Sequence, residues 1–364
     1  MGFAEFLGNT ETVTQMRRML QRDRFPHAVI LTGARGSGKY MLAQMVAKAM
    51  NCESPIETDG LPDFCGHCSQ CERIGVNDDL DKRFAEAVEA RDALKDSEKR
   101  ETNIIVQNHP DVMVLPPDPP QLLVKVGQVR HLIASVYYQP QAGRRKVYIF
   151  SDASFMKEAA NAILKVLEEP PNFATIFLLA ENATQLLPTI RSRCIQLRLT
   201  PQEPEMIEKL LTRRIDWTAA QRQLAARLCE GAAGRAMRFD LAGYINSRKD
   251  ALTLIKTGLG ETSDHEALFR ATETYRAGGD GKIRTDALFD ALHLLLEDLL
   301  YIQSNRGDKI RNCDILDELQ RLAESVDFDW IAAASERISA TQTAQRRNVL
   351  RPLALEALSA SFER

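Results

Sequence analysis

The sequence predicts an α/β domain built around a parallel sheet, followed by a region made only of helices. Three observations lead to this prediction. A phosphate-loop pattern, Gly-Ala-Arg-Gly-Ser-Gly-Lys-Tyr at 33–40, lies between an apolar strand-like run and an amphipathic segment. Strand-like and helix-like segments alternate from this loop to residue 199, as they do where helices cover both faces of a parallel sheet. From Thr200 onward the segments have only helical periodicity.

The loop itself has the residue types that bind phosphate. Gly33, Gly36 and Gly38 let backbone N–H groups close around phosphate oxygens, and Lys39 is placed to reach the terminal phosphates of a nucleotide. Tyr40, however, stands where a Ser or Thr hydroxyl normally holds Mg²⁺, and its phenol lies too far from the backbone to bind the same ion. The loop therefore predicts a P-loop fold, but it does not predict that this chain itself binds ATP or ADP.

A second apolar strand, at 146–152, ends in Asp152, as expected of the strand that helps to hold Mg²⁺ in a P-loop ATPase. In such enzymes a Glu follows this Asp and polarises the attacking water. Here the next residue is Ala153, so we expect a domain that keeps the fold without the hydrolysis. Glu158 or Glu168, in the next predicted helix, remains an alternative source of that carboxylate, although helical spacing aims both elsewhere.

The cysteines indicate a metal site. Four of the seven form one cluster with the spacing of a tetrahedral zinc site: Cys52, Cys65, Cys68 and Cys71. Four thiolates fill the coordination shell, which indicates a structural Zn²⁺; an iron–sulfur cluster is the alternative, and His67 is a competing ligand. The remaining cysteines lie on apolar stretches and are expected to be small buried hydrophobes: Cys194, Cys229 and Cys313.

Length and charge limit the functions to consider. A chain of 364 residues has room for two or three domains, and a net charge of −3 does not by itself indicate nucleic-acid binding. No run of eighteen apolar residues is present, and the N-terminus lacks a basic-then-apolar signal. We therefore expect a cytoplasmic protein that does not enter a membrane.

The expected organisation has three parts: an α/β domain over 1–199, a three-helix unit over 200–245 and a larger helical domain over 246–364. Two insertions follow the first helix after the phosphate loop. One is the cysteine cluster at about 52–72, and the other is a charged stretch at 73–108 that is typical of one or two solvated helices.

Two motifs carry a resemblance to a known family. They are Asn-Ala-Ile-Leu-Lys-Val-Leu-Glu-Glu-Pro-Pro at 161–171 and Leu-Pro-Thr-Ile-Arg-Ser-Arg-Cys at 187–194, which ends in Ser-Arg-Cys. With them the chain resembles bacterial clamp-loader subunits of the AAA+ superfamily, and the resemblance spans nearly its whole length. Further similar segments are 3–33, the cysteine knuckle, 109–111 and 348–358.

This resemblance implies an AAA+ P-loop domain with a RecA-like parallel sheet, a helical lid and an all-α collar. It further implies a ring of five subunits that places a sliding clamp on primed DNA within the DNA polymerase III holoenzyme. The chain combines an altered phosphate loop and an altered strand end at 152–153 with an intact Ser-Arg-Cys motif. In this combination it resembles the non-motor, delta-prime class of these subunits. The implied partners are the tau/gamma motor subunits and the delta subunit, and we expect no intrinsic ATPase activity.

The resemblance also implies roles for single residues. Arg193, of Ser-Arg-Cys, would act as an arginine finger in trans, at the ATP site of a neighbouring subunit; the alternative is a surface arginine paired with a carboxylate. Arg191 is its nearby competitor. Asn182 stands at the position of a polar sensor, and Arg235 resembles the second sensor arginine of the lid, with a solvated helix arginine as the alternative.

Two other functions remain open. The chain is an ATP-hydrolysing motor subunit of the tau/gamma type if the changes at Tyr40 and Ala153 are tolerated. A zinc-dependent DNA-binding module is the other alternative, which the acidic balance and the lack of interleaved basic and aromatic residues disfavour.

Overall fold

The computed structural model describes residues 2–213, 216–262, 264–276, 279–345 and 350–363. Residue contacts divide the chain into two compact units. Unit 1 comprises Met1–Ile207 and Gly231–Arg235, and unit 2 comprises Glu208–Glu230 and Ala236–Arg364. The domain boundaries expected after residues 199 and 245 remain predictions.

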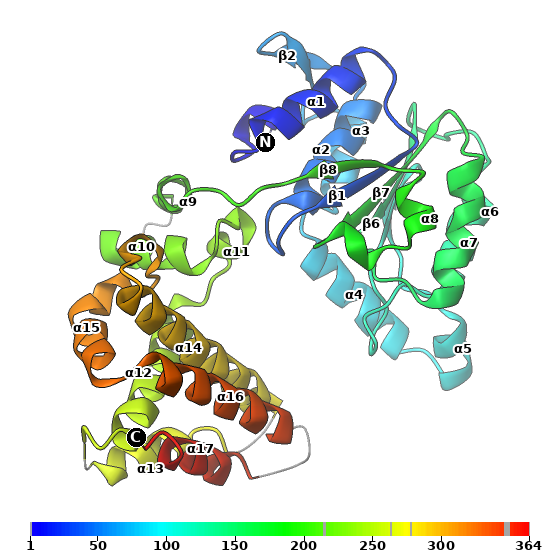
Figure 1. Cartoon of the computed structure of the whole chain (residues 1–364). Helices are drawn as coiled ribbons and strands as arrows, with labels where there is room; N and C mark the ends of the chain where they lie inside the picture. The colour runs from blue at the N-terminus through cyan, green and yellow to red at the C-terminus, as the bar shows by residue number, and fades with distance from the viewer. Residues whose placement is uncertain (1, 214–215, 263, 277–278, 346–349, 364) are drawn as a thin grey trace. The chain divides into compact units, whose positions relative to one another are not determined.

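A six-stranded sheet forms the centre of unit 1, with the order β4-β5-β6-β7-β1-β8. Figure 1 labels four of these strands, β6, β7, β1 and β8. Neighbouring strands are parallel except β4 and β5, which are antiparallel. The strands are β1 Ala28–Thr32, β4 Val106–His109, β5 Val112–Leu115, β6 Lys146–Phe150, β7 Ala174–Ala180 and β8 Ile195–Arg198. Every residue of β5, β6 and β7 is buried, and all but Lys146 and Thr175 are apolar, as in a parallel sheet that is covered on both faces.

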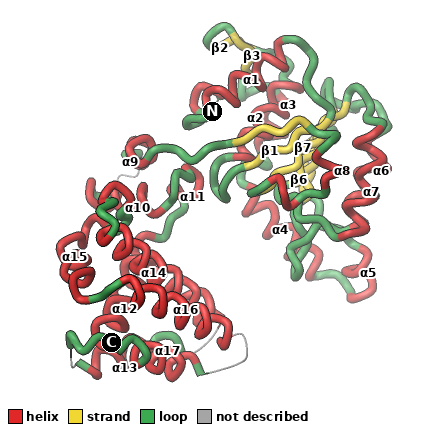
Figure 2. The backbone as a smooth tube through the Cα atoms, viewed as in Figure 1, coloured by secondary structure: helices red, strands yellow, loops and turns green. Residues whose placement is uncertain are grey.

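Helices cover both faces of this sheet, which Figure 2 shows in yellow between them. Along β1, Val29 and Leu31 face one apolar core while Ala28 and Ile30 face the other, because successive strand residues point to opposite faces. The first core includes residues of α1 Thr10–Gln21, α2 Lys39–Asn51 and α3 Ser69–Gly75. The second includes residues of α6 Val126–Val136, α7 Lys157–Glu168 and α8 Pro188–Arg191. The predicted α/β architecture is confirmed.

The charged stretch at 73–108 contains two helices, α4 Leu80–Asp92 and α5 Asp96–Glu101, before β4 begins. The expectation of solvated helices does not hold for Arg91, which is only 8% exposed. Its Nη1 lies 2.7 Å from Oδ1 of the fully buried Asp118, which also pairs with Lys125. A buried ion pair therefore fixes α4 to the segment after β5, because a charge left alone at this depth would be costly.

Unit 2 has helices and no strand within its described residues. The α-helices that lie wholly in this unit are α10 Ala219–Leu228, α12 Leu241–Gly258, α13 His265–Glu273, α14 Gly279–Gln303, α15 Leu316–Ser325, α16 Phe328–Gln345 and α17 Arg351–Ala360. The longest, α14, packs against α12, α15 and α16 and contributes fully buried residues such as Phe289 and Leu292. The helix expected at 348–358 corresponds to α17, and Asn348 lies outside the described residues.

The boundaries between the two units fall within two shorter helices. One lies in α9 Pro204–Leu211, between Ile207 and Glu208, and the other lies in α11 Ala233–Met237, between Arg235 and Ala236. None of the helices in the described ranges combines the length and the apolar composition that a membrane crossing requires.

Candidate functional site

The phosphate loop lies between β1 and α2, as the sequence predicts. Its backbone has positive φ at Gly36 (81°) and Gly38 (92°), a conformation that side chains with a Cβ rarely adopt. Close contacts also require these glycines. A Cβ at Gly36 would lie 2.7 Å from the backbone N of Arg235, and one at Gly38 would lie 3.0 Å from ring carbons of Phe6. Protein atoms therefore contact the loop closely at both glycines.

Lys39 is turned toward its own loop. The Nζ donates to the carbonyl oxygens of Gly33 at 2.6 Å and Ala34 at 2.8 Å. Burial lowers the pKa of Lys39, while the carboxylates of Glu181 and Asp152 act to raise it. In this arrangement the ammonium group stabilises the loop through two hydrogen bonds, and two nearby carboxylates favour its charged form.

Glu181 was not among the residues singled out from the sequence, although it influences Lys39 more strongly than Asp152 does. It directly follows β7, the strand next to β1, whereas Asp152 follows β6, one strand further away. Its position at the carboxyl end of an apolar strand is the signal by which sequence reasoning could have found it, because ligands of α/β sheets bind at that edge.

The side chain of Tyr40 points to the inserted segment. Its hydroxyl donates to the carbonyl oxygen of Asn77 at 2.6 Å and accepts from Nε2 of Gln44 at 2.6 Å. Burial raises the pKa of the phenol. Asn77 is fully buried and its Oδ1 accepts from Asn108 at 2.5 Å, so the tyrosine joins α2 to the turn after α3 and to β4. The residue at the metal-binding position of the motif therefore acts as an internal anchor.

Asp152 and Ala153, which follow β6, also form hydrogen bonds within the domain. Oδ1 of Asp152 accepts from the backbone N–H and the hydroxyl of Ser154, at 3.1 and 2.7 Å. Ala153 is buried, and its N–H donates to the carbonyl of Leu179 at 2.7 Å. Of the two alternative acids, Glu158 is exposed in the first turn of α7, and Glu168 lies at the opposite end of that helix.

The two sensor positions lie at different places in unit 1. Oδ1 of Asn182 accepts from the N–H of Thr184 at 3.0 Å and so caps a short turn, while the residue itself is exposed. Arg235 lies in α11 with an exposed side chain, next to Gly234, whose N–H donates to the carbonyl of Gly36 at 2.7 Å. Among the described residues, the segment of Arg235 therefore contacts the loop through a backbone hydrogen bond, whereas the side chain of Asn182 bonds to its own turn.

Arg193 follows α8 and makes three contacts. Its Nη2 forms an ion pair with Oε1 of Glu168 at 2.8 Å, and its Nη1 donates to the Thr189 carbonyl at 2.9 Å and to the Ser192 hydroxyl at 3.3 Å. The side chain is 35% exposed. The alternative considered from the sequence, a carboxylate partner in the same chain, is thus present. Arg191, the competing residue, has a buried Nε without a partner among the described residues.

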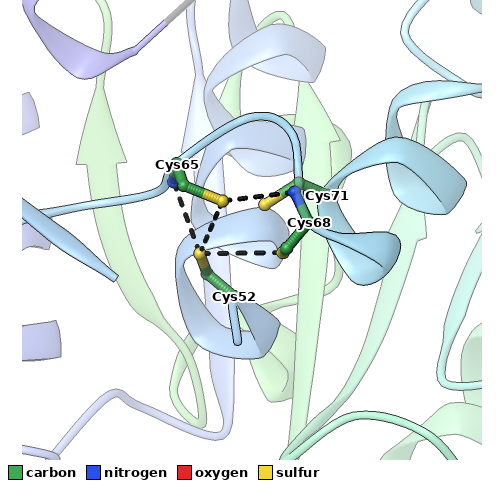
Figure 3. A group of neighbouring side chains, drawn as sticks. All are labelled: Cys52, Cys65, Cys68 and Cys71. Atoms are coloured by element: carbon green, nitrogen blue, oxygen red, sulfur yellow. Dashed lines mark hydrogen bonds between the residues drawn. The ribbon is translucent and has the colours of Figure 1, made fainter. Parts of the chain in front are cut away.

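The four clustered cysteines come together at the end of α2 and the start of α3, on either side of a short hairpin of β2 Ile56–Thr58 and β3 Leu61–Asp63 (Figure 3). Their sulfur atoms all lie within 4.8 Å of one another. The Sγ atoms of Cys52 and Cys65 are 3.5 Å apart and those of Cys52 and Cys68 are 3.9 Å apart. A tetrahedron with Zn–S bonds of about 2.3 Å has S···S edges of about 3.8 Å, so the group fits one zinc ion.

The surroundings favour the thiolate at Cys68, whereas burial raises the pKa of the Cys52 and Cys71 thiols. Backbone N–H groups of Cys65 and Cys68 each donate to a cysteine sulfur at 3.3 Å. Burial acts to raise the pKa of Cys68, but hydrogen bonds from the backbone of Cys71 and Glu53 outweigh it and lower the pKa to about 6. His67 is exposed, and its Nδ1 lies 2.9 Å from the Cys65 carbonyl, so the four sulfurs form the candidate ligand set.

A phosphate loop between a strand and a helix of this largely parallel sheet defines a P-loop protein. Residues 8–203 match the family model described as "DNA polymerase III, delta subunit". Because this match spans more than half of the chain, the chain belongs to that family of clamp-loader subunits.

The chain is also similar to individual proteins. The delta-prime subunit of Bacillus subtilis is 27% identical over 84% of this chain and 80% of its own length. That of Pseudomonas aeruginosa is 31% identical over 52% of this chain and 53% of its own length. The tau subunit of Escherichia coli is 30% identical over 81% of this chain, but the match spans only 36% of tau. Among solved structures, a gamma subunit-related protein of Thermotoga maritima aligns over 96% of this chain and 98% of its own, with 16% identity and a TM-score of 0.44.

Proposed function

We propose that the chain is a non-motor, delta-prime-like subunit of the DNA polymerase III clamp loader. In this role it joins tau/gamma motor subunits and a delta subunit in a ring that loads the sliding clamp on primed DNA. It supplies Arg193 in trans to the ATP site of a neighbour. The similarity to delta-prime subunits, one of them matched over 84% of this chain, supports the proposal. A cytoplasmic location follows from this role.

The observation that carries the proposal is a contrast within one domain. Two positions that normally serve ATP hydrolysis in the same chain have structural roles here. Tyr40, at the position of the Mg²⁺-binding hydroxyl, bonds to the insertion, and Ala153, at the position of the water-polarising acid, is buried. Arg193, by contrast, keeps its guanidinium partly exposed at the end of α8. A domain that lacks its own hydrolytic groups but presents an arginine suits a subunit that completes the site of another.

An arginine finger supplied in trans is worth ~10³–10⁵ in the rate of phosphoryl transfer, or about 4–7 kcal/mol of barrier. The planar guanidinium contacts two phosphate oxygens at once, which an ammonium group does not reproduce. We also propose that the four-cysteine group holds one structural Zn²⁺, which stabilises the knuckle between α2 and α3.

The experiment is clamp loading by a reconstituted complex that contains an Arg193→Ala variant. We expect normal assembly, because a partly exposed ion pair contributes little stability, and strongly reduced loading. Arg193→Lys is expected to restore little. Arg83→Ala is the matched control: it removes an arginine that is 31% exposed and paired to Glu86 at 2.7 Å on α4. Normal loading by an assembled Arg193→Ala complex would show that the arginine is structural.

The similarity to tau subunits supports one other candidate, an ATP-hydrolysing motor subunit. Steady-state ATPase of the isolated chain at saturating Mg-ATP distinguishes the two. We expect no turnover above background, and turnover that Lys39→Ala abolishes would favour the motor subunit.

A further inference from the structure

The end of α7 carries two adjacent carboxylates. Glu168 is the last residue of this helix and Glu169 is its C-cap, just before Pro170 and Pro171. A carboxylate in the last turn of a helix is unfavourable, because the helix dipole places partial negative charge there. Glu168 has a compensating cation in Arg193, whereas Glu169 has no ion-pair partner among the described residues.

The guanidinium of Arg193 is held from two directions. Thr189 and Ser192, in and after α8, accept from its Nη1, and Glu168 of α7 pairs with its Nη2. A long arginine side chain loses rotamer freedom when it binds a ligand, and a side chain that is already ordered loses less. The contacts leave the group 35% exposed, so an anion can still approach it.

We infer that Glu168 is the positioning residue for Arg193: it holds the guanidinium in the orientation in which it meets the phosphate groups of a neighbouring subunit's nucleotide. The inference rests on the proposed function, since it assigns a partner to the proposed finger. An exposed ion pair is weak and exchanges readily. The carboxylate therefore orients the arginine without keeping it from a triphosphate, which carries more negative charge.

The test is Glu168→Gln in the reconstituted complex, which removes the charge and keeps the shape. We expect the rate of clamp loading at saturating ATP to fall about threefold to tenfold, the range that corresponds to ordering one long side chain. The ATP concentration for half-maximal loading should stay unchanged, because the side chain acts on the reaction step. Glu168→Asp, which keeps the charge, should recover part of the rate.

Two comparisons make the result specific. Glu169→Gln removes the neighbouring charge from the same helix end and should load at the wild-type rate. In an Arg193→Ala background, Glu168→Gln should cause no further loss, since its effect passes through the arginine. Assembly and melting temperature of each variant are measured alongside.

The outcomes separate the two proposals. If Arg193→Ala loads normally, the proposed finger fails. If Arg193→Ala slows loading but Glu168→Gln loads as fast as wild type, or faster, Glu168 does not position the finger or instead restrains it, and the inference is wrong. An equal loss in the presence and absence of Arg193 would also overturn it, because the carboxylate would then act independently.

Discussion

Tyr40→Phe removes one hydroxyl from the phosphate-loop helix and tests whether that hydroxyl anchors the insertion. In the folded chain the group satisfies two buried partners, the carbonyl of Asn77 and the Nε2 of Gln44, each at 2.6 Å. Asn77 is 0% exposed and Gln44 is 1% exposed, so water does not readily replace the lost bonds. The ring itself is retained, and its apolar packing should be unchanged.

The magnitude follows from these two partners. A buried polar group left without a hydrogen bond costs about 1–3 kcal/mol, so we expect the free energy of unfolding of unit 1 to fall by about 2–4 kcal/mol. For a domain of this size each kcal/mol lowers the melting temperature by roughly 2–4 °C. A decrease of roughly 4–16 °C is therefore expected, measured by circular dichroism during heating.

Tyr138→Phe is the matched control, because it removes the same atom from a side chain that is 70% exposed. Its expected change is below about 0.5 kcal/mol. If Tyr40→Phe melts at the wild-type temperature, the hydroxyl does not stabilise the insertion and the anchoring role of Tyr40 is refuted. An equal decrease in both variants would point to a general effect of losing a phenol.

Two further predictions concern the metal centre and a half-buried carboxyl. Elemental analysis of the reduced protein should find one zinc per chain. A Cys68→Ser, Cys71→Ser double variant should lose the zinc and have a lower melting temperature, since structural zinc sites contribute ~10–16 kcal/mol of apparent binding. Full metal retention by this variant would contradict the proposed ligand set. Burial raises the pKa of Asp250 above its ordinary 3.8, and its carboxylate accepts from the Tyr275 hydroxyl at 2.7 Å. A raised folded-state pKa means that this carboxyl favours folding most at low pH and loses that contribution as the pH rises through the folded pKa. Urea unfolding should therefore show Asp250→Asn gaining stability relative to wild type between pH 4 and pH 7, and a pH-independent difference would refute the raised pKa.

Features that depend on neighbouring positions in the chain were predictable from the sequence. The strand, the loop at 33–40 and the helix after it each follow from a short local pattern, and the structure has all three. The cysteines converge for a similar reason: three of them are spaced three residues apart, and the hairpin before Cys65 brings Cys52 close. Local spacing was enough because turns and short hairpins determine these contacts.

Contacts between distant segments were decided only by the tertiary structure. Glu181 acts on Lys39 because the sheet order places β7 beside β1, and an apolar run does not state which strand will be its neighbour. Arg91 belongs to a charged stretch that predicts solvated helices, but it is buried and paired with Asp118. The pairing of Arg193 with Glu168 likewise depends on how α8 packs against α7. Periodicity indicates which side chains face a core, but the partners that they meet there depend on the packing of the whole domain, which no local pattern encodes.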